Sequence, residues 1–161
     1  MKKIKNIALI TSQGGHLGQF KLIFDETVIR ENNCILITED INPKIKDKYF
    51  LGRYRTYFLK KDVLLKLNPF TYIKTLFSLI EILRKEKIDL IFTNGAQISI
   101  PAVIAVRILG IKSVFIDTVI RVKTPNWSAR VCYLFADTFW VQHEQMARKY
   151  GRKAKYVGGI V

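Results

Sequence analysis

Short apolar runs alternate along the chain with longer segments in which apolar residues recur every three or four positions. The short runs are bounded by glycine, asparagine or aspartate, as buried strands commonly are, and the longer segments have the period of amphipathic helices. The predicted strands are Asn6–Thr11, Cys34–Thr38, Arg53–Leu59, Asp89–Thr93, Lys112–Ile116, Asp137–Val141 and Lys155–Val157. The predicted helices are His16–Asn32, Pro69–Lys87, Ile98–Leu109, Trp127–Phe135 and His143–Tyr150.

Strands that alternate with helices in this way predict a parallel sheet with helices on both faces. We therefore expect a single Rossmann-like α/β domain over residues 1–161. The alternating stretch Arg53–Leu59 suits a strand at or near a sheet edge. Asn68 before Pro69 is a typical helix start. The helix that follows is expected to turn the following side chains toward the core: Ile73, Leu76, Phe77, Ile80 and Leu83.

A glycine turn connects the first strand to the first helix. A strand, a turn containing Gly14 and Gly15, and a helix start form an anion site, because free backbone N–H groups and the helix dipole favour negative charge. The turn has neither the G-x-G-x-x-G fingerprint of a dinucleotide site nor the Gly-Lys-Ser/Thr end of a P-loop. The same dipole should keep His16 neutral, so it could act as an acceptor or base. The alternative is that His16 only caps the turn.

In sheets of this kind, ligands bind at the carboxyl ends of the strands. Polar residues in the turns there are expected to form one site with the glycine turn. For Asp117 and Gln142 the alternative is a structural cap, and for Arg121 and Lys123 it is a solvated loop charge. Neither a metal nor a cofactor is expected. The candidate residues are Ser12, Gly14, Gly15, His16, Asn94, Gly95, Asp117, Arg121, Gln142 and His143.

The most informative feature of the composition is the net charge. Lysine and arginine number 27 against 13 acidic residues, a net charge of +14, which implies an anionic partner. The basic residues are interleaved with large aliphatics and match no nucleic-acid motif, so nucleic acid is not the expected partner. Cys34 and Cys132 lack C-x-x-C spacing and are read as reduced thiols. Because no apolar stretch is long enough to span a bilayer, we expect a cytoplasmic protein with at most peripheral membrane attachment.

Lysines and bulky aliphatics mix between Lys60 and Phe77, which predicts a segment lying on an anionic membrane surface. The alternative is that these aliphatics pack in the core. The residues expected to face the membrane are Lys60, Lys61, Leu64, Leu65, Lys66, Phe70 and Lys74.

Four motifs together resemble a known family: S-x-G-G-H-x-G-Q at 12–19, T-N-G at 93–95, F-I-D-T-V-I-R-V-K-T at 115–124 and V-Q at 141–142. They are similar to the acceptor-side subunit of split glycosyltransferases, which include bacterial PssD/CpsF-type polysaccharide biosynthesis proteins. The eukaryotic membrane-anchor subunit of the dolichol-linked N-acetylglucosaminyltransferase belongs to the same group. More distantly, the chain resembles the N-terminal half of MurG.

The resemblance implies the N-terminal half of a GT-B glycosyltransferase, whose UDP-sugar domain is supplied by a donor-binding partner subunit. The acceptor would be a lipid-diphosphate-linked sugar used in capsule or exopolysaccharide biosynthesis, at the inner face of the cell membrane. Carried over, Gly14, Gly15 and His16 would face the acceptor diphosphate and its hydroxyl. Asp117 stands where relatives usually have glutamate. The implied reaction is inverting and metal-independent, with His16 or Asp117 as the base.

Two other interpretations stay open at this point. A self-contained Rossmann-type enzyme would use Glu39, at the end of the second strand, to bind a ribose. A non-catalytic membrane adaptor would use the basic surface to recruit a transferase.

Overall fold

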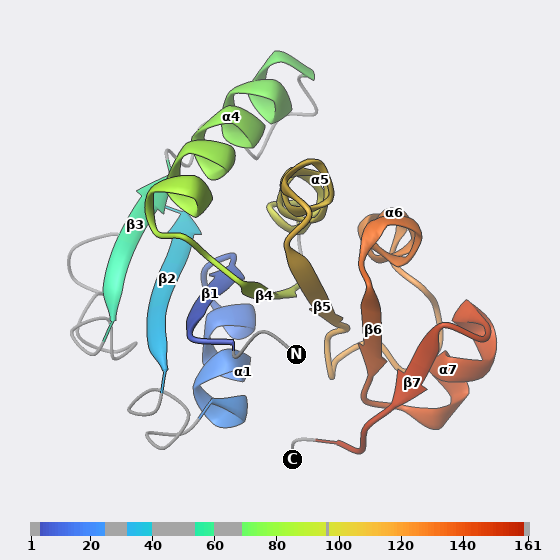
Figure 1. Cartoon of the computed structure of the whole chain (residues 1–161). Coiled ribbons are helices and arrows are strands. Elements are labelled where there is room, and N and C mark those ends of the chain that lie inside the picture. Colours follow the sequence, from blue (N-terminus) through green and yellow to red (C-terminus); the bar gives the residue numbers. More distant parts are fainter. Residues whose placement is uncertain (1–3, 25–31, 40–53, 60–68, 96, 160–161) are drawn as a thin grey trace.

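The computed structural model describes residues 4–24, 32–39, 54–59, 69–95 and 97–159 (Figure 1). Its strands form one seven-stranded parallel sheet in the order β3-β2-β1-β4-β5-β6-β7. The predicted strands are confirmed, and β3 lies at a sheet edge as expected. The strands are β1 (Asn6–Thr11), β2 (Asn33–Glu39), β3 (Arg55–Leu59), β4 (Leu90–Asn94), β5 (Lys112–Ile116), β6 (Thr138–Val141) and β7 (Ala154–Tyr156).

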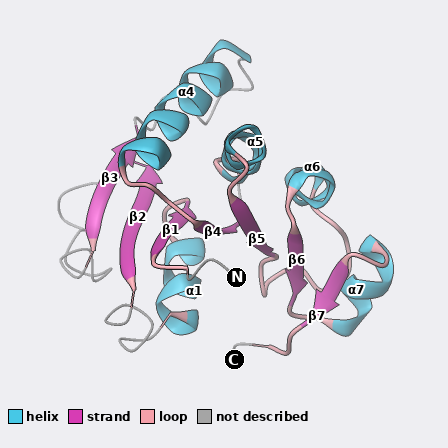
Figure 2. Ribbon diagram, in the orientation of Figure 1, coloured by secondary structure: helices cyan, strands magenta, loops and turns pink. Residues whose placement is uncertain are grey.

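Helices cover both faces of the sheet, which confirms the Rossmann-like α/β architecture. In Figure 2, α4, α5 and α6 lie along one face and α1 lies against the other. The helices are α1 (Gly15–Ile23), α4 (Pro69–Lys85), α5 (Ser99–Leu109), α6 (Trp127–Phe135) and α7 (Glu144–Tyr150).

Side-chain alternation along the strands divides the core between the two faces. Ala8 and Ile10 of β1 pack with α4 and α5, whereas Ile7 and Leu9 pack with α1. The sheet order runs outward in both directions from the β1–β4 pair. In open α/β sheets this switch point opens a crevice at the carboxyl ends of the strands. The fold therefore places the ends of β1 and β4 at the position where such proteins bind ligands.

Helix α1 ends at Ile23, well before the predicted limit. Phe24 has an extended backbone, with φ −104°, and its ring lies 4.8 Å from that of Phe92 on β4. The chain leaves the helix at this point, and the Phe24 ring packs against the sheet. Residues 25–31 of the predicted helix lie outside the described part of the chain, and its last residue, Asn32, is described and is not helical.

The expected core face of α4 is wrong in two positions. Ile73 and Phe77 are 48% and 65% exposed, whereas Thr75, Leu79 and Leu83 are buried. Phe77 and Leu79 are two residues apart, which places them roughly 200° apart around a helix. Since the packing with α5 and the sheet uses the Thr75–Leu79–Leu83 side, Phe77 must face away from it. Ile73 lies at the margin of that side, where it is half exposed beside α5.

Candidate functional site

The predicted glycine turn lies at the carboxyl end of β1, on the switch point. Gly14 caps α1 with φ +76°, a conformation that favours glycine, and its carbonyl accepts from Gly18 N at 3.0 Å. Among the described residues, no heavy atom lies within 4 Å of where a Cβ would stand on Gly14 or Gly15. The backbone of the turn is therefore open to a ligand. Ser12, just before it, is buried.

The end of β4 holds His16 in place. Asn94 Nδ2 donates to the His16 carbonyl at 2.7 Å and lies 3.3 Å from Gln19 Oε1. The imidazole lies directly against the backbone of Gly95. A Cβ on Gly95 would stand 2.6 Å from His16 Nε2 and closer still to two other ring atoms. Thus Asn94 and Gly95, predicted to line the site, instead contact its histidine.

The hydroxyl groups of Thr93 and Ser99 stabilise the turn at Gly95. Ser99 Oγ donates to the Gly95 carbonyl, and it lies 2.8 Å from Thr93 Oγ1. Both hydroxyls belong to buried residues at the junction of β4 and α5. The position of the His16 ring is therefore set by β4 as much as by its own helix.

The surroundings of His16 favour the neutral form of its ring. Burial lowers the pKa of His16 below its ordinary value, because the charged ring would lose its solvation. We expected a lowered pKa from the helix dipole, but burial is the cause found here. Nδ1 is buried and has no hydrogen-bond partner among the described residues. A neutral imidazole with an unpaired nitrogen is suited to accept a proton or a hydrogen bond.

Other buried polar atoms near the turn also lack partners in the part of the chain that the structure describes. They are Asn94 Oδ1, Gln19 Nε2 and Gln97 Oε1. Buried polar groups are normally hydrogen-bonded, so a group of unpaired ones marks a place for water or a ligand.

A second cluster forms where β5 and β6 end. Asp117 is 2% exposed, and its Oδ1 accepts from Thr118 N at 3.0 Å. Gln142 Nε2 donates to the Asp117 carbonyl at 2.7 Å. Asp117 Oδ2 and the Tyr150 hydroxyl are close enough to influence each other, but neither makes a hydrogen bond of ordinary geometry in the described structure.

Burial raises the pKa of Asp117, and the Thr118 N–H, Tyr150, Arg121 and His143 partly oppose this shift. His16 is not among the described groups that act on this carboxyl. The structure therefore brings His16, Asn94 and Gly95 together, and Asp117, Arg121 and Gln142 together. The two groups occupy neighbouring strand ends.

Three residues of these clusters were missed by the sequence analysis: Gln19, Ser99 and Tyr150. Gln19 and Ser99 are polar residues inside otherwise apolar helical segments, and both are buried. That exception to the helical pattern was the signal available. Tyr150 gave none, because an aromatic residue near a helix end is ordinary core material.

Of the residues expected to face a membrane, Phe70 and Lys74 are described, and both are exposed on α4. Lys60, Lys61, Leu64, Leu65 and Lys66 lie outside the described residues. Beside Ile73, an apolar groove of about 250 Å³ runs between α4 and α5. Its lining residues are Tyr72, Ile73, Leu76, Ile100, Pro101 and Ile104. In the described part of the chain, every helix is too short or too polar to cross a bilayer.

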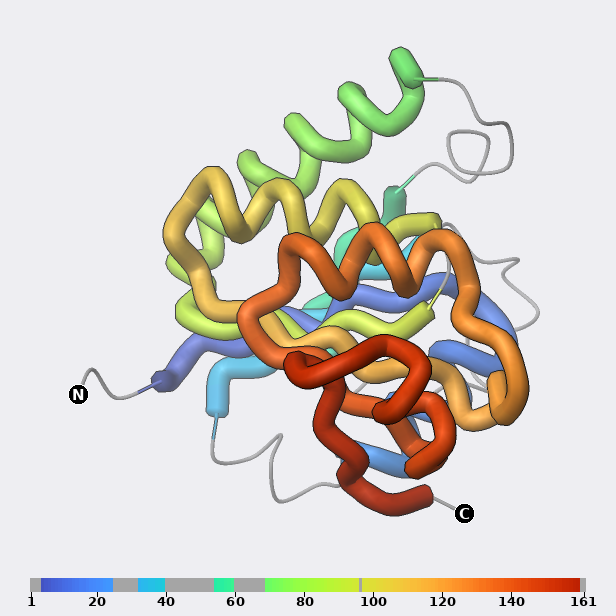
Figure 3. The backbone as a smooth tube through the Cα atoms, turned by 90° about the vertical axis from the view of Figure 1, so that its right-hand side faces the viewer, coloured from blue at the N-terminus to red at the C-terminus, as the bar shows by residue number. Residues whose placement is uncertain are grey.

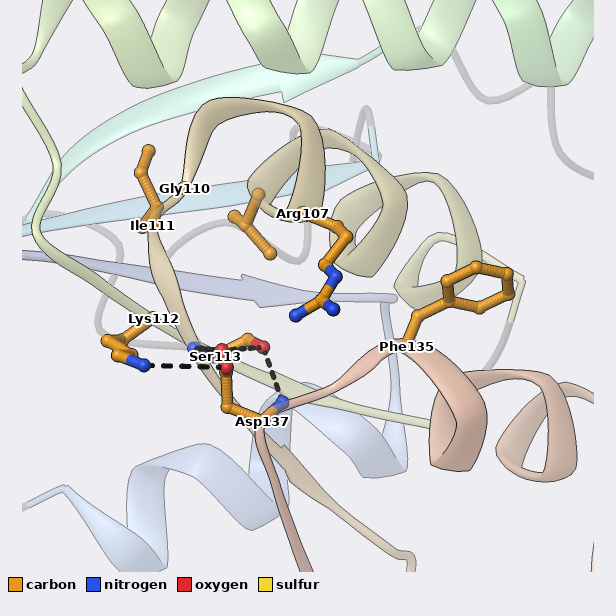
Figure 4. Close-up of a pocket in the computed structure, with 8 residues that line it drawn as sticks. Arg107, Gly110, Ile111, Lys112, Ser113, Phe135 and Asp137 are labelled. Carbon is orange, nitrogen blue, oxygen red and sulfur yellow. Dashed lines mark hydrogen bonds and ion pairs between the residues drawn. The ribbon is translucent and has the colours of Figure 1, made fainter.

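A small cavity of about 150 Å³ lies at the opposite edge of the sheet, where β5 and β6 begin (Figure 4). Asp137 Oδ2 accepts from Ser113 N at 2.9 Å and from Ser113 Oγ at 3.0 Å, while Asp137 N donates to that hydroxyl. Lys112 Nζ lies 3.7 Å from the same carboxyl group. These hydrogen bonds join the starts of β5 and β6. The polar groups of Ser113 and Asp137 are thus already paired and are poorly suited to bind a ligand. No group of three metal-binding side chains occurs within the described residues.

The fold and the switch-point site define a Rossmann-like α/β domain with a ligand crevice at the ends of β1 and β4. MurG from Acinetobacter baumannii superposes with a TM-score of 0.75 at 16% identity, over 96% of this chain and 46% of MurG. UDP-N-acetylglucosamine 2-epimerase from Rickettsia bellii has the same TM-score at 17% identity, over 98% of this chain and 46% of the epimerase. At such identities the likeness concerns the fold alone.

The family model described as "Oligosaccharide biosynthesis protein Alg14 like" matches residues 60–160, and the chain belongs to this family. It is 28% identical to human UDP-N-acetylglucosamine transferase subunit ALG14 over 98 residues, 57% of this chain and 45% of the human protein.

A bacterial relative is the UDP-N-acetylglucosamine–N-acetylmuramyl-(pentapeptide) pyrophosphoryl-undecaprenol N-acetylglucosamine transferase of Clostridium kluyveri. It is 32% identical over 111 residues, which are 63% of this chain and 30% of the transferase. The chain thus spans less than half the length of these relatives, which are themselves glycosyltransferases or a transferase subunit.

Proposed function

We propose that this chain is the acceptor-binding, membrane-associated subunit of a split glycosyltransferase. It adds a sugar from a UDP-sugar to a lipid-diphosphate-linked sugar at the inner face of the cell membrane. The observation that carries the proposal is a half-buried His16, with a lowered pKa, beside an open glycine turn at the switch point of this fold. The motif resemblance to PssD/CpsF-type proteins favours capsule or exopolysaccharide biosynthesis as the setting.

In this proposal the turn binds the acceptor diphosphate. The backbone N–H groups at Gly14 and Gly15 open a helix, and such groups bind phosphate without side-chain help. His16 takes the proton from the acceptor hydroxyl as its oxygen attacks the anomeric carbon. The bond from that carbon to the nucleotide diphosphate breaks, and UDP leaves with the bonding electrons. The configuration inverts, and no metal is required.

Asp117 serves this reaction indirectly. A general base must reach the acceptor hydroxyl, and a carboxyl group that is 2% exposed and engaged by Thr118 N is poorly placed to do so. Its hydrogen bond instead fixes the start of the loop that carries Arg121. We therefore assign the base to His16 and a positioning role to Asp117, with Arg121 beside the acceptor. Gln142, which is 3% exposed, supports Asp117 through the hydrogen bond to its carbonyl.

The membrane face is supported by α4. Phe70, Ile73 and Phe77 are exposed along one side of this helix, with Lys74 among them. Exposed aromatic and aliphatic residues next to a lysine suit the interface of an anionic leaflet. The amino end of α4 lies at the carboxyl edge of the sheet, because the helix runs antiparallel to the strands it connects. Membrane contact there would bring the site to its lipid-linked substrate.

The donor is assigned to a partner chain. Transfer requires two substrates held together, and the site described here contains one anion turn. Human ALG14, a relative, is described as a transferase subunit. The partner would supply the UDP-sugar domain.

The test is transfer from a panel of UDP-sugars to a polyprenyl-diphosphate sugar, with the chain alone and with its candidate partner. Activity should require both chains. His16→Ala should lower kcat by about 10²–10⁴-fold, the usual contribution of a general base, while Tm changes little. Lys21→Ala, at an exposed position of the same helix, is the control and should keep full activity. Full activity of the isolated chain would refute the split enzyme, and equal turnover of His16→Ala and the parent would refute the base.

A further inference from the structure

Residues 118–127, which run from the loop after β5 to the first residue of α6, present isolated apolar side chains to solvent. Ile120 is 79% exposed, Val122 is 42% exposed and Trp127 is 50% exposed. Arg121 and Lys123 alternate with them and are also exposed. The segment thus combines large apolar groups and cations on one surface loop.

The backbone of this exposed loop is held in place by hydrogen bonds. Val119 O lies 2.6 Å from His143 Nε2, and Arg121 N donates to Thr118 O at 3.2 Å. Lys149 Nζ donates to the Lys123 carbonyl. Because the backbone is tied to α7 on both sides of Ile120, the apolar side chains are presented without a further ordering cost on binding.

The surface around the segment is positively charged. Residues 118–136 contain no aspartate or glutamate, and the carboxyl group of Asp117 at its start is buried. The bond from Lys149 to the loop brings another cation close to Lys123. A hollow of about 470 Å³ is lined by residues 120–124, with Arg121 and Lys123 among its walls.

The segment lies at the same edge as the site. It directly follows the carboxyl end of β5, and α4 begins at that edge with the exposed Phe70. Figure 3 shows both the segment and the amino end of α4 on the side toward which the strands run.

We propose that residues 118–127 form a second membrane contact, which places Ile120, Val122 and Trp127 among the head groups of an anionic leaflet. The inference rests on the proposed function, because it supplies the second support that orients the site toward a lipid-linked acceptor. Tryptophan and lysine beside aliphatics suit a membrane interface. A protein partner is the less favoured occupant, because residues 118–136 carry only positive charges, which an anionic leaflet complements.

Tryptophan fluorescence gives a direct test. The chain has two tryptophans, so Trp140→Phe leaves Trp127 as the reporter. With vesicles containing phosphatidylglycerol, Trp127 emission should shift to the blue and be quenched by brominated lipid chains. Vesicles of phosphatidylcholine alone should have little effect. A Trp127 signal that stays unchanged while the protein sediments with anionic vesicles would overturn this contact and leave the membrane role of α4 intact.

A matched pair of double variants tests the residues. Ile120→Ser/Lys123→Gln should weaken binding to anionic vesicles by at least about fivefold, the effect of one lysine near an anionic leaflet. Lys21→Gln/Leu22→Ser removes the same kinds of group from α1, where Leu22 is 64% exposed, and should bind like the parent. Equal losses in the two variants would overturn the proposal, because net charge alone would then explain binding.

A transfer assay separates this proposal from the function on which it rests. With a water-soluble short-chain acceptor and no vesicles, Ile120→Ser/Lys123→Gln should turn over like the parent. If the variant loses turnover there, or loses the partner chain while still binding vesicles, the segment serves the catalytic complex and the membrane contact is refuted. If the parent itself shows no transfer but Trp127 still responds to vesicles, the proposed function fails and the membrane contact stands.

Discussion

The strongest test of the site is Gly95→Ala, because two separate features of the structure disfavour any side chain at this position. Its φ is +55°, and the His16 ring occupies the space where a side chain would begin. The substitution adds one methyl group, carries no charge and removes no hydrogen-bonding group. Any effect on His16 must therefore come from displacement of the ring.

Its magnitude has two parts. An alanine in the left-handed region costs about 1–2 kcal/mol, which lowers Tm by about 2–8 °C in a chain of this size. The methyl group would also stand 2.6 Å from His16 Nε2 and nearer to other ring atoms, whereas real Cβ contacts almost never fall under 3.0 Å. The imidazole must move, and leaving its buried position should bring the pKa of His16 back up toward its ordinary value.

The chain offers a matched control in Gly110, which ends α5. Gly110 has φ +67°, and no heavy atom among the described residues lies within 4 Å of its Cβ position. Gly110→Ala should therefore show the backbone cost without the effect on the ring. An NMR pH titration of the His16 ring reads the difference, since the chain has two histidines, His16 and His143.

We expect Gly95→Ala to raise the pKa of His16 and to lower kcat in the two-chain transfer assay. Gly110→Ala should change only Tm. If Gly95→Ala leaves the His16 titration unchanged and loses no more stability than Gly110→Ala, then Gly95 does not position the ring.

Three further predictions follow from the contacts. Asn94→Ala removes the hydrogen bond to the His16 carbonyl and should lower the free energy of unfolding, measured by chemical denaturation, by about 1–3 kcal/mol. It should also lower kcat more than Gly110→Ala does. An unchanged kcat would contradict the role of Asn94 in positioning His16. Asp117→Asn should stabilise the protein at pH 8, because burial raises the pKa of Asp117 and the fold disfavours its charge. The gain in the free energy of unfolding should vanish at acidic pH, where the carboxyl group is protonated in both the folded and the unfolded state. A gain independent of pH would be evidence against this cause. Leu79→Ala should lower the free energy of unfolding by about 2–5 kcal/mol, because Leu79 is buried. Phe77→Ala should change stability little and should weaken vesicle binding. Equal destabilisation by the two variants would contradict the orientation of α4.

The sheet and the glycine turn could be predicted because both depend on local sequence. Strands such as Lys112–Ile116 are apolar runs bounded by breakers, and the parallel sheet follows from their alternation with helices. Gly14 and Gly15 identify themselves by their position after the first strand. These features need no knowledge of what packs against them.

The rest depended on packing between distant segments. The contact between His16 and Gly95 joins the start of α1 to the turn after β4, and the spacing of these residues in the sequence does not predict it. The orientation of α4 was missed for a similar reason: Ile73 and Phe77 satisfy a helical apolar pattern as well as Leu79 does. Which of the overlapping stripes is buried depends on where α5 lies. Asp117 was correctly placed near the strand ends, but its burial arises from the contacts of α6 and α7 with the sheet.

The geometry of an inverting transfer explains why the donor should come from outside this domain. The attacking oxygen and the leaving diphosphate lie on opposite sides of the anomeric carbon, so the base and the nucleotide cannot occupy the same anion turn. In the proposed reaction, the turn, His16 and the hydrogen-bonded end of β4 would all lie on the acceptor side. The donor must then approach over the carboxyl edge of the sheet, from a surface facing His16. A UDP-sugar should therefore bind weakly to the isolated chain and tightly to the two-chain complex, and isothermal titration of each decides the question. Tight binding by the isolated chain that is lost in Glu39→Ala would instead identify a self-contained Rossmann-type site at the end of β2.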